Sequence, residues 1–331
     1  MAIRLVTVFG ASGFLGRHVA QRLAAKGLQV RAAVRNPDAA LFLKPMGYVG
    51  QITPVQANIR NEASVRAAVE GADAVVNLVG VLYESGKQRF EAVQAAGPDT
   101  IAKAARAAGC SRMVHVSALG AARLSPSRYA RSKAAGEEAV RAAFPDAVIL
   151  RPSVMFGPQD GFFNRFAAMS LLSPFLPVFG CPFPRIKDGA IDFYGTGGTK
   201  FQPVYVGDVA DAVVKGIEDE TTKGKIYELG GPRVYSFVEV MRMVMAETGR
   251  CRAIVPVPFW LGSILGLFGE LLPVPPITRD QVTQLKTDNV VGGKLPTLRD
   301  LGIEPTAAEM IVPTYLDAYR RGGRYRRARL V

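Results

Sequence analysis

Two kinds of apolar pattern alternate along the first part of the chain. Short runs of consecutive apolar residues predict strands that are buried on both faces, and segments with apolar residues every three or four positions predict helices. The predicted strands are Ile3–Phe9, Gln29–Val34, Ile52–Ala57, Ala74–Val79 and Met113–Ser117. The predicted helices run from Gly16 to Lys26, from the Asn61 cap to Glu70 and from Pro98 to Ala108. This alternation of strands and helices implies a parallel sheet with right-handed crossovers.

We therefore expect an α/β fold, a Rossmann-type doubly wound parallel sheet with a smaller C-terminal domain. The nucleotide-binding domain is expected to cover residues 1–160, with residues 203–232 returning to its sheet. Residues 161–202 and 233–331 are expected to form the smaller C-terminal domain, which ends in a basic tail.

Two capping patterns predict helix starts in the smaller domain. In each, a Ser or Thr precedes a Glu by three residues, so that both side chains can bond the first backbone N–H groups of a helix. The two pairs are Ser236 with Glu239 and Thr306 with Glu309. Gly322 is then expected to close the last helix.

A glycine-rich turn joins the first predicted strand to the first predicted helix. It is Gly10-Ala11-Ser12-Gly13-Phe14-Leu15-Gly16, with the spacing G-x-x-G-x-x-G. Gly10 permits a sharp turn, Gly13 exposes backbone N–H groups, and Gly16 lets helix and strand pack closely. The positive end of the helix then faces the pyrophosphate of a dinucleotide. The glycines alone would also fit an ordinary turn, but strand, turn and helix in this order predict a dinucleotide site.

The end of the second predicted strand distinguishes NAD from NADP. An acid at this point binds the ribose 2′-hydroxyl of NAD, whereas an arginine accommodates the 2′-phosphate of NADP. Arg35 stands there, and Arg17 is a second candidate contact, so we expect NADPH; the alternative is a solvated surface arginine. Asn58 and Ile59 are expected beside the adenine, and the bare backbone of Gly80 beside the ribose or nicotinamide.

A tyrosine and a lysine downstream of the fifth predicted strand can carry proton chemistry. Tyr129 and Lys133 are four residues apart, which places them on one face of a helix. A nearby ammonium favours the phenolate and suits a tyrosine to proton transfer. The alternative for such a pair is an exposed helix face.

Several segments resemble the short-chain dehydrogenase/reductase superfamily, in its extended or atypical branch. They are residues 10–16, Asn77–Gly80, the VSALGA run around Ser117, YARSK at 129–133, Leu150–Asp160, Pro203–Val213 and Tyr227–Pro232. The resemblance implies that Tyr129 is the proton donor, that Lys133 binds the ribose and tunes the tyrosine, and that Ser117 holds the substrate oxygen. The expected cofactor contacts, including those argued above, are Gly10, Ser12, Gly13, Phe14, Leu15, Gly16, Arg35, Asn58, Ile59, Leu78, Val79, Gly80, Ser117, Tyr129, Lys133, Pro152 and Val154.

The sequence departs from that superfamily beside Ser117. The next two positions, Ala118 and Leu119, are apolar where extended enzymes commonly place the catalytic hydroxyl. A donor must lie within hydrogen-bond reach to polarise a carbonyl. The departure weakens the case for hydride transfer but not the case for cofactor binding. One interpretation is that the catalytic role of Ser117 is vestigial.

Residues 127–169 most resemble the short-chain-dehydrogenase-like accessory subunits of respiratory complex I and their bacterial relatives. This resemblance implies NADPH bound without known turnover, other complex I subunits as partners, and a position where the peripheral arm meets the membrane. The alternative is a stand-alone NADPH-dependent reductase or epimerase that uses Tyr129 and Lys133.

Composition narrows the class of protein further. The chain has 331 residues, 49% of them hydrophobic, which is ample for a sizeable core. Three scattered cysteines and two histidines predict neither disulfides nor a metal site. The net charge of +13 favours an anionic partner, and we expect an anionic membrane surface. Nucleic acid is not expected, because basic and aromatic residues are not interleaved.

The apolar pattern also bears on localisation. The first strand begins near the N-terminus, which leaves no targeting peptide, and no apolar run is long enough to span a bilayer. We therefore expect a peripheral protein on the cytoplasmic face of a bacterial inner or plasma membrane.

One apolar segment and the basic tail are candidates for docking. Phe259–Leu272, with Trp260 and Phe268, is too short to cross a bilayer but can lie in its interface. The alternative is a lid packed over a substrate pocket. The tail carries Arg320, Arg321, Arg324, Arg326, Arg327 and Arg329 and no acid, which is typical of a contact arm.

Overall fold

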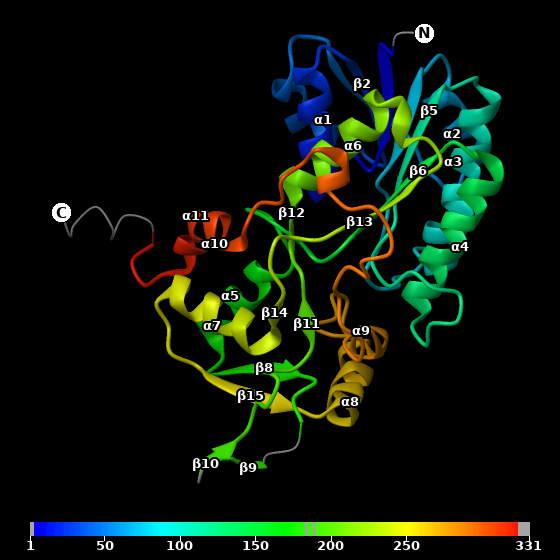
Figure 1. The fold of residues 1–331 in the computed structure, drawn as a ribbon. Coiled ribbons are helices and arrows are strands. Elements are labelled where there is room, and N and C mark those ends of the chain that lie inside the picture. Colours follow the sequence, from blue (N-terminus) through cyan, green and yellow to red (C-terminus); the bar gives the residue numbers. More distant parts are fainter. Residues whose placement is uncertain (1–2, 183–184, 188–189, 324–331) are drawn as a thin grey trace. The chain divides into compact units, whose positions relative to one another are not determined.

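The computed structural model describes residues 3–182, 185–187 and 190–323, which form two compact units (Figure 1). Unit 1 comprises Met1–Pro152, Val206–Leu229 and Gly292–Glu304, and unit 2 comprises Ser153–Tyr205, Gly230–Val291 and Pro305–Val331. Unit 1 thus takes in residues 292–304, which the sequence pattern assigns to the smaller domain.

Unit 1 is built on a seven-stranded sheet in which every neighbouring pair is parallel. Its strands are β1 (Leu5–Phe9), β2 (Gln29–Val34), β3 (Ile52–Gln56), β4 (Ala74–Asn77), β5 (Arg112–Val116), β6 (Val148–Pro152) and β13 (Ile226–Leu229). Their order is β13-β6-β5-β4-β1-β2-β3. The continuous apolar runs form strands because helices cover both faces of such a sheet. The predicted Rossmann-type sheet is therefore confirmed.

The fourth strand is shorter than its apolar run predicts. It ends at Asn77, whereas the pattern continues to Val79. The reason is local: the Asn77 side chain accepts the N–H of Val79 at 3.1 Å, and this hydrogen bond takes the place of one between the strands of the sheet.

Helices cover both faces of this sheet (Figure 1). They are α1 (Phe14–Ala25), α2 (Glu62–Val69), α3 (Ala96–Ala107), α4 (Arg128–Ala143) and α6 (Val206–Glu218). On one face α1 packs against α6, and on the other α3 packs against both α2 and α4. The predicted cap of α2 is confirmed, because the Asn61 side chain accepts the N–H of Ser64 at 3.1 Å.

Four short helical segments complete unit 1. Three are 3₁₀ helices, at Asp38–Met46, Glu220–Thr222 and Arg299–Leu301. The fourth, Glu91–Ala95, is a π-helix directly before α3. Single π turns of this kind often accompany functional sites.

Unit 2 has short strands around an aromatic core. Its helices are α5 (Phe163–Leu172), α7 (Phe237–Thr248), α8 (Phe259–Gly269), α9 (Arg279–Gln284), α10 (Ala308–Ile311) and α11 (Pro313–Leu316), with a 3₁₀ turn at Asp317–Tyr319. The strand pairs are β8 (Phe175–Phe179) with β15 (Ala253–Val257), β7 (Met155–Phe156) with β12 (Val204–Tyr205), β11 (Lys200–Phe201) with β14 (Tyr235–Ser236), and β9 (Arg185–Lys187) with β10 (Ala190–Asp192). Phe156, Phe163, Phe237 and Leu316 are buried together in its core.

One predicted capping box of unit 2 is confirmed and the other is wrong. Ser236 and Glu239 form a reciprocal box at the start of α7. By contrast, α10 begins at Ala308, and its N-cap residue, Ala307, has no side chain that can cap. The Glu309 carboxylate instead accepts the Tyr235 hydroxyl at 2.6 Å.

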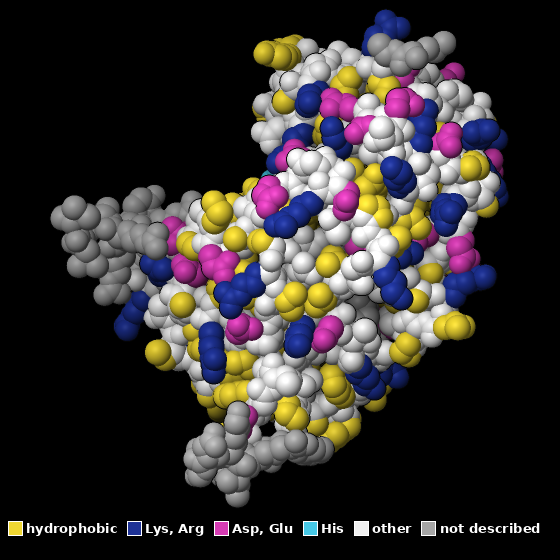
Figure 2. Space-filling model, in the orientation of Figure 1, with side chains coloured by type: hydrophobic (Ala, Val, Ile, Leu, Met, Phe, Trp, Pro, Cys, Tyr) yellow, Lys and Arg dark blue, Asp and Glu magenta, His cyan; other side chains and the backbone are white. Residues whose placement is uncertain are grey.

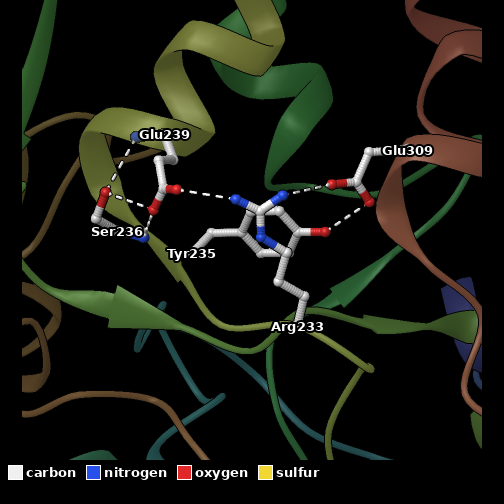
Figure 3. Close-up of polar contacts among 5 residues, drawn as sticks. All are labelled: Arg233, Tyr235, Ser236, Glu239 and Glu309. Atoms are coloured by element: carbon white, nitrogen blue, oxygen red, sulfur yellow. Dashed lines mark hydrogen bonds and ion pairs between the residues drawn. The ribbon is translucent and has the colours of Figure 1, made fainter.

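Figure 3 shows the contacts that the Glu309 carboxylate makes. The Arg233 guanidinium bridges Glu239 at 3.1 Å and Glu309 at 3.3 Å, and it lies over the Tyr235 ring at 4.9 Å. Burial, and then the bond to Glu309, raises the pKa of Tyr235. A carboxylate that serves a distant tyrosine in this way is not available to cap its own helix.

The chain end departs from the predicted helix closure. The last described helical turn ends at Tyr319, and Gly322 follows it with a φ of 92°. Most of the predicted arginine tail (Arg324, Arg326, Arg327 and Arg329) lies outside the described residues.

Candidate nucleotide-binding site

The glycine turn has the geometry that close ligand approach requires. Gly10 has a φ of 82°, and its carbonyl accepts the N–H of Gly13 at 3.0 Å. A Cβ on Gly16 would lie 2.6 Å from the Cα of Ala11 and would collide with the carbonyl of Gly10. Gly13 is the N-cap of α1 and provides no side-chain cap, and the first turn contains no acid. Ser12, Phe14 and Leu15 complete a turn whose N–H groups suit a phosphate.

Arg17 is held against this turn. Its Nε donates to the carbonyl of Gly13 at 3.3 Å, and its guanidinium lies 5.0 Å from the centre of the Phe42 ring. Arg35 is exposed directly after β2. The exposed guanidinium of Arg35 is therefore available to an anion at the end of that strand.

The residues predicted beside the adenine occupy different environments. Ile59 is buried, and a Cβ on Gly97 would lie 2.6 Å from its Cδ1 atom. Asn58 is held in a local turn, in which its N–H donates to Ser64 at 2.9 Å and its side chain accepts the N–H of Arg60. Ile59 thus belongs to the apolar core of unit 1, and the role of both residues toward adenine stays a prediction.

The segment after β4 brings Lys133 beside the glycine turn. A Cβ on Gly10 would lie 3.3 Å from Val79, and a Cβ on Gly80 would lie 3.2 Å from the Nζ of Lys133. Leu78 directly precedes Val79, and its N–H donates to the carbonyl of Phe9. The structure therefore gathers Gly10, Val79, Gly80 and Lys133 at the carboxyl end of the sheet, where α/β folds bind ligands.

Tyr129 and Lys133 lie on α4, and burial disfavours the charged form of each side chain. Lys133 is buried and donates from Nζ to the carbonyl of Val116 at 3.2 Å; burial lowers its pKa to about 8, although Glu137 opposes the shift. Tyr129 is half-buried and packs edge-to-face on Phe90 at 5.9 Å. Burial raises the pKa of Tyr129 to about 12, so it outweighs the lowering expected from the lysine.

Two buried polar atoms near this pair lack a protein hydrogen-bond partner within the described part of the chain. They are the Nε2 of His115, on β5, and the Oγ of Ser117, which directly follows that strand. The N–H of Ser117 still donates to the carbonyl of Leu150 on β6, so the two side chains, two residues apart, lie on one face of the sheet. The His115 Nδ1 lies 3.1 Å from the Asn77 amide nitrogen. Burial, and then the charge of Lys133, lowers the pKa of His115 to about 3, so its ring is neutral.

This arrangement fits a dinucleotide. Because the Asn77 amide nitrogen is a donor, the His115 Nδ1 accepts and the proton lies on Nε2. A buried donor and a buried hydroxyl without protein partners suit a ligand with its own polar atoms. His115 is not among the contacts predicted from the sequence; the alternation of side chains along the strand, which puts His115 and Ser117 on one face, was the available signal.

The last two predicted contacts belong to different units. Pro152 ends unit 1, where its carbonyl accepts the N–H of Leu119 at 3.0 Å. Val154 is in unit 2, and its N–H donates to the Asn289 side chain at 3.0 Å. Their contact with a nucleotide stays a prediction.

The described residues also bear on two other classes of site, a metal site and a membrane-spanning helix. Among residues 3–182, 185–187 and 190–323, no three His, Cys, Asp or Glu side chains are grouped so that they could hold a metal ion. Within the same ranges, no helix has the length and apolar character needed to cross a bilayer.

The parallel sheet, the glycine turn and the tyrosine–lysine pair on α4 define a dinucleotide-binding protein of the short-chain dehydrogenase/reductase type. The chain belongs to the NAD dependent epimerase/dehydratase family, whose sequence profile matches residues 6–230.

Three known proteins show what the chain is similar to. It is 35% identical to the mitochondrial NADH dehydrogenase (ubiquinone) 1 alpha subcomplex subunit 9 of Mus musculus, over 97% of this chain and 81% of that protein. It is 36% identical to ceramide reductase of Caulobacter vibrioides over 53% of each chain. The structure of UDP-glucose 4-epimerase from Thermus thermophilus, in complex with NAD, superposes with a TM-score of 0.69 at 20% identity, over 95% of this chain and 98% of that one.

Proposed function

We propose that this protein is an accessory subunit of respiratory complex I that holds NADPH mainly for structure and docks near the membrane arm. The similarity to a mouse NADH dehydrogenase subunit over 97% of the chain carries the proposal. A complete glycine turn, combined with a Tyr129 whose pKa is raised to about 12, supports binding without turnover. In this proposal the chain lies on the cytoplasmic face of a bacterial membrane, with other complex I subunits and an anionic membrane surface as its partners.

In this proposal, different residues of unit 1 bind different parts of the nucleotide. The N–H groups of Phe14 and Leu15, in the first turn of α1, bind the pyrophosphate, and Arg35 pairs with the 2′-phosphate. Lys133 donates to the ribose, while Ser117 and His115 offer polar atoms toward the nicotinamide end. The nicotinamide ring would supply hydride chemistry when bound.

Two features of the chain oppose turnover. Ala118 and Leu119 provide no hydroxyl beside Ser117, and burial raises the pKa of Tyr129 to about 12, further from physiological pH than that of an ordinary tyrosine. A general acid works best when its pKa lies near the operating pH. Holding the nucleotide still has a physical use, because a ligand bound only by the folded state stabilises it by roughly 2.7 kcal/mol at 100 times its Kd.

A pull-down from solubilised membranes, probed for respiratory-chain subunits, tests the proposal. We expect these subunits to co-purify with the chain, and we expect the purified chain to retain NADPH through gel filtration. Tyr129→Phe is expected to retain NADPH and partners as the parent does. Recovery of the chain without any respiratory subunit would contradict the proposal.

A stand-alone NADPH-dependent reductase or epimerase is the second candidate. The intact Tyr129 and Lys133 pair and the similarity to ceramide reductase over 53% of the chain favour it. Steady oxidation of NADPH with a carbonyl substrate that disappears in Tyr129→Phe would establish this candidate instead.

A further inference from the structure

Helix α8 has an inverted distribution of side chains. Its buried residues are all glycines, Gly262, Gly266 and Gly269, which follow one another at the spacing of a single helix face. Its large apolar side chains are exposed. Trp260 is 65% exposed and Phe268 is 64% exposed. A helix of a water-soluble surface ordinarily has the opposite arrangement.

Close backbone packing explains why the inner face consists of glycine. A Cβ on Gly262 would lie 2.5 Å from the Phe179 ring, and one on Gly266 would lie 2.7 Å from the backbone nitrogen of Arg279. A Cβ on Gly269 would lie 2.6 Å from the carbonyl oxygen of Ile277. Because the helix meets the protein through its backbone along this face, most of its bulky side chains point outward; the exception is Phe259 at its start, whose ring stacks on Phe179.

The exposed apolar surface extends beyond the helix. Leu271 is 79% exposed and Val274 is 71% exposed in the segment that follows. The other exposed apolar residues of this surface are Ile264, Leu265, Leu267 and Leu272. We call these eight residues the α8 surface. Figure 2 shows hydrophobic side chains gathered where Figure 1 places α8, with Lys or Arg side chains beside them.

The charges around the α8 surface suit an anionic boundary. The segment contains one acid, Glu270, and Arg279 neutralises it through a two-nitrogen contact with Oε2 at 2.9 and 3.1 Å. Lys286 lies over the Phe259 ring at 5.9 Å, and Arg165 donates to the carbonyls of Pro275 and Pro276. Cations therefore border the apolar surface, and its single carboxylate is already paired.

The polar content of the α8 surface distinguishes a lipid from a protein partner. Protein interfaces form about one hydrogen bond per 100–200 Å². Among the side chains of the α8 surface, the Trp260 indole N–H is the only hydrogen-bonding group. The hydroxyl of Ser263, on the same helix, is already bonded to the carbonyl of Phe259. A bilayer interface requires no directional partners, and it accepts Trp, Phe and Leu side chains.

We infer that α8 lies flat in the interface of an anionic bilayer, with its glycine face on the protein and the α8 surface among the lipids. The inference gives a residue-level form to the proposed docking near a membrane. It concerns a property of the chain by itself, since neither nucleotide nor other subunits are needed for it. The alternative of a pocket lid would require Trp260 and Phe268 to face inward, and both are mostly exposed.

Trp260 is the only tryptophan of the chain and therefore reports on α8 directly. We would add vesicles of phosphatidylcholine and phosphatidylglycerol to the purified full chain and record its fluorescence. The expected result is a blue shift of the emission and quenching by lipids brominated near the headgroup end of the acyl chain. An unchanged emission in the presence of bound vesicles would overturn the inference, because charge alone would then hold the protein.

Matched variants separate insertion from general adhesion. Phe268→Asp with Leu271→Asp keeps the reporter and should weaken vesicle binding at least about tenfold, at low and at high salt. Val49→Asp removes a fully exposed apolar residue from unit 1 and should bind vesicles as the parent does. Equal binding by all three proteins would overturn the inference. A blue shift that appears without lipid as protein concentration rises would also overturn it, because a second copy would then cover α8.

Failure of this inference is distinguishable from failure of the proposed function. If vesicles leave Trp260 unchanged but respiratory subunits still co-purify with the chain, a protein partner covers α8. If vesicles shift Trp260 but no subunit co-purifies, the chain is a membrane-bound protein of another kind.

Discussion

Helices α1 and α8 both use glycines to bring backbones close together, and they do so with opposite consequences. Gly16 of α1 lies against Gly10 and Ala11, so the glycine turn stays free of side chains and open to a ligand. The remaining buried positions of α1, such as Leu15 and Val19, are apolar and face the sheet. In α8 the fully buried residues are all glycines, and most of the large apolar residues are exposed.

The difference shows that apolar periodicity alone does not say which face of a helix is buried. In α1 polar residues mark the outer face, so the pattern identifies the inner one. All residues of α8 are apolar except Ser263 and the glycines. In such a helix the position of the smallest residues decides the orientation, because backbone contact is available only where no side chain intervenes.

The largest effect is expected from breaking the glycine turn. Gly16→Ala places a Cβ 2.6 Å from the Cα of Ala11, and backbone atoms cannot give way as a flexible side chain can. We expect the free energy of unfolding to fall by about 3 kcal/mol and nucleotide binding to be lost. Gly27→Ala is the control; it has open space around it, and its strain at a φ of 82° should cost only about 1 kcal/mol.

Denaturant unfolding and NADPH titration of both variants measure this prediction. Loss of binding in Gly27→Ala as well would show that general destabilisation, and not the turn, removes the nucleotide. Full NADPH affinity in Gly16→Ala would show that the turn tolerates a side chain.

A second prediction concerns the buried cation near the glycine turn, which has no counterpart in α8. The folded chain releases the Lys133 proton at a pKa of about 8, against 10.5 for an unperturbed lysine. Between these values the unfolded state binds more protons, so stability rises with pH; below pH 8 the cost of the buried charge is fully present. Lys133→Met should therefore exceed the nucleotide-free parent in stability by about 1–3 kcal/mol at pH 7, and the difference should shrink toward pH 10.

Urea denaturation at pH 7, 8, 9 and 10 measures this difference. The raised pKa of Tyr129 acts in the opposite direction only above pH 10, where the unfolded tyrosine ionises first. Lys103→Met is the control, because Lys103 is exposed and pairs with Asp99 on the surface. A difference between Lys133→Met and the parent that does not change with pH would contradict the prediction.

The third prediction tests the cofactor preference. Arg35→Asp replaces a cation after β2 by the acid that serves NAD, so NADPH should bind about tenfold to a hundredfold more weakly and NADH should be affected much less. Lys103→Asp, the same charge change at an exposed position of α3, should leave the ratio of the two affinities unchanged. Equal titration curves for NADPH and NADH with the parent would end the idea of an NADPH preference.

These cases show how much could be predicted from the sequence. Five of the seven strands of unit 1, β1 to β5, were predicted because their apolar runs are continuous, and the Asn61 cap because it is local. The pairing of Glu309 with Tyr235 was missed, since those residues lie far apart in the chain and the local pattern suggested a cap. The contact of His115 with Asn77 joins two strands and was missed for the same reason.

The smallest effect is expected at α8, and it distinguishes the two uses of glycine most sharply. In an ordinary exposed helix, Gly→Ala gains about 1 kcal/mol from helix propensity. Gly266→Ala instead places a Cβ 2.7 Å from the backbone nitrogen of Arg279, and overpacking of this kind costs about 1–3 kcal/mol. The two terms oppose each other, so the net loss of stability should be about 1 kcal/mol, with α8 pushed away from α9.

Ser263→Ala on the same helix is the control; it removes one hydrogen bond of a hydroxyl group and should change stability by less than about 0.5 kcal/mol. Because Trp260 lies on α8, its emission should report the displacement in Gly266→Ala and not in Ser263→Ala. A Gly266→Ala variant more stable than the parent would contradict the prediction. It would show that α8 can move away from α9 without cost, so that close packing of the glycines does not determine which side chains of α8 are exposed.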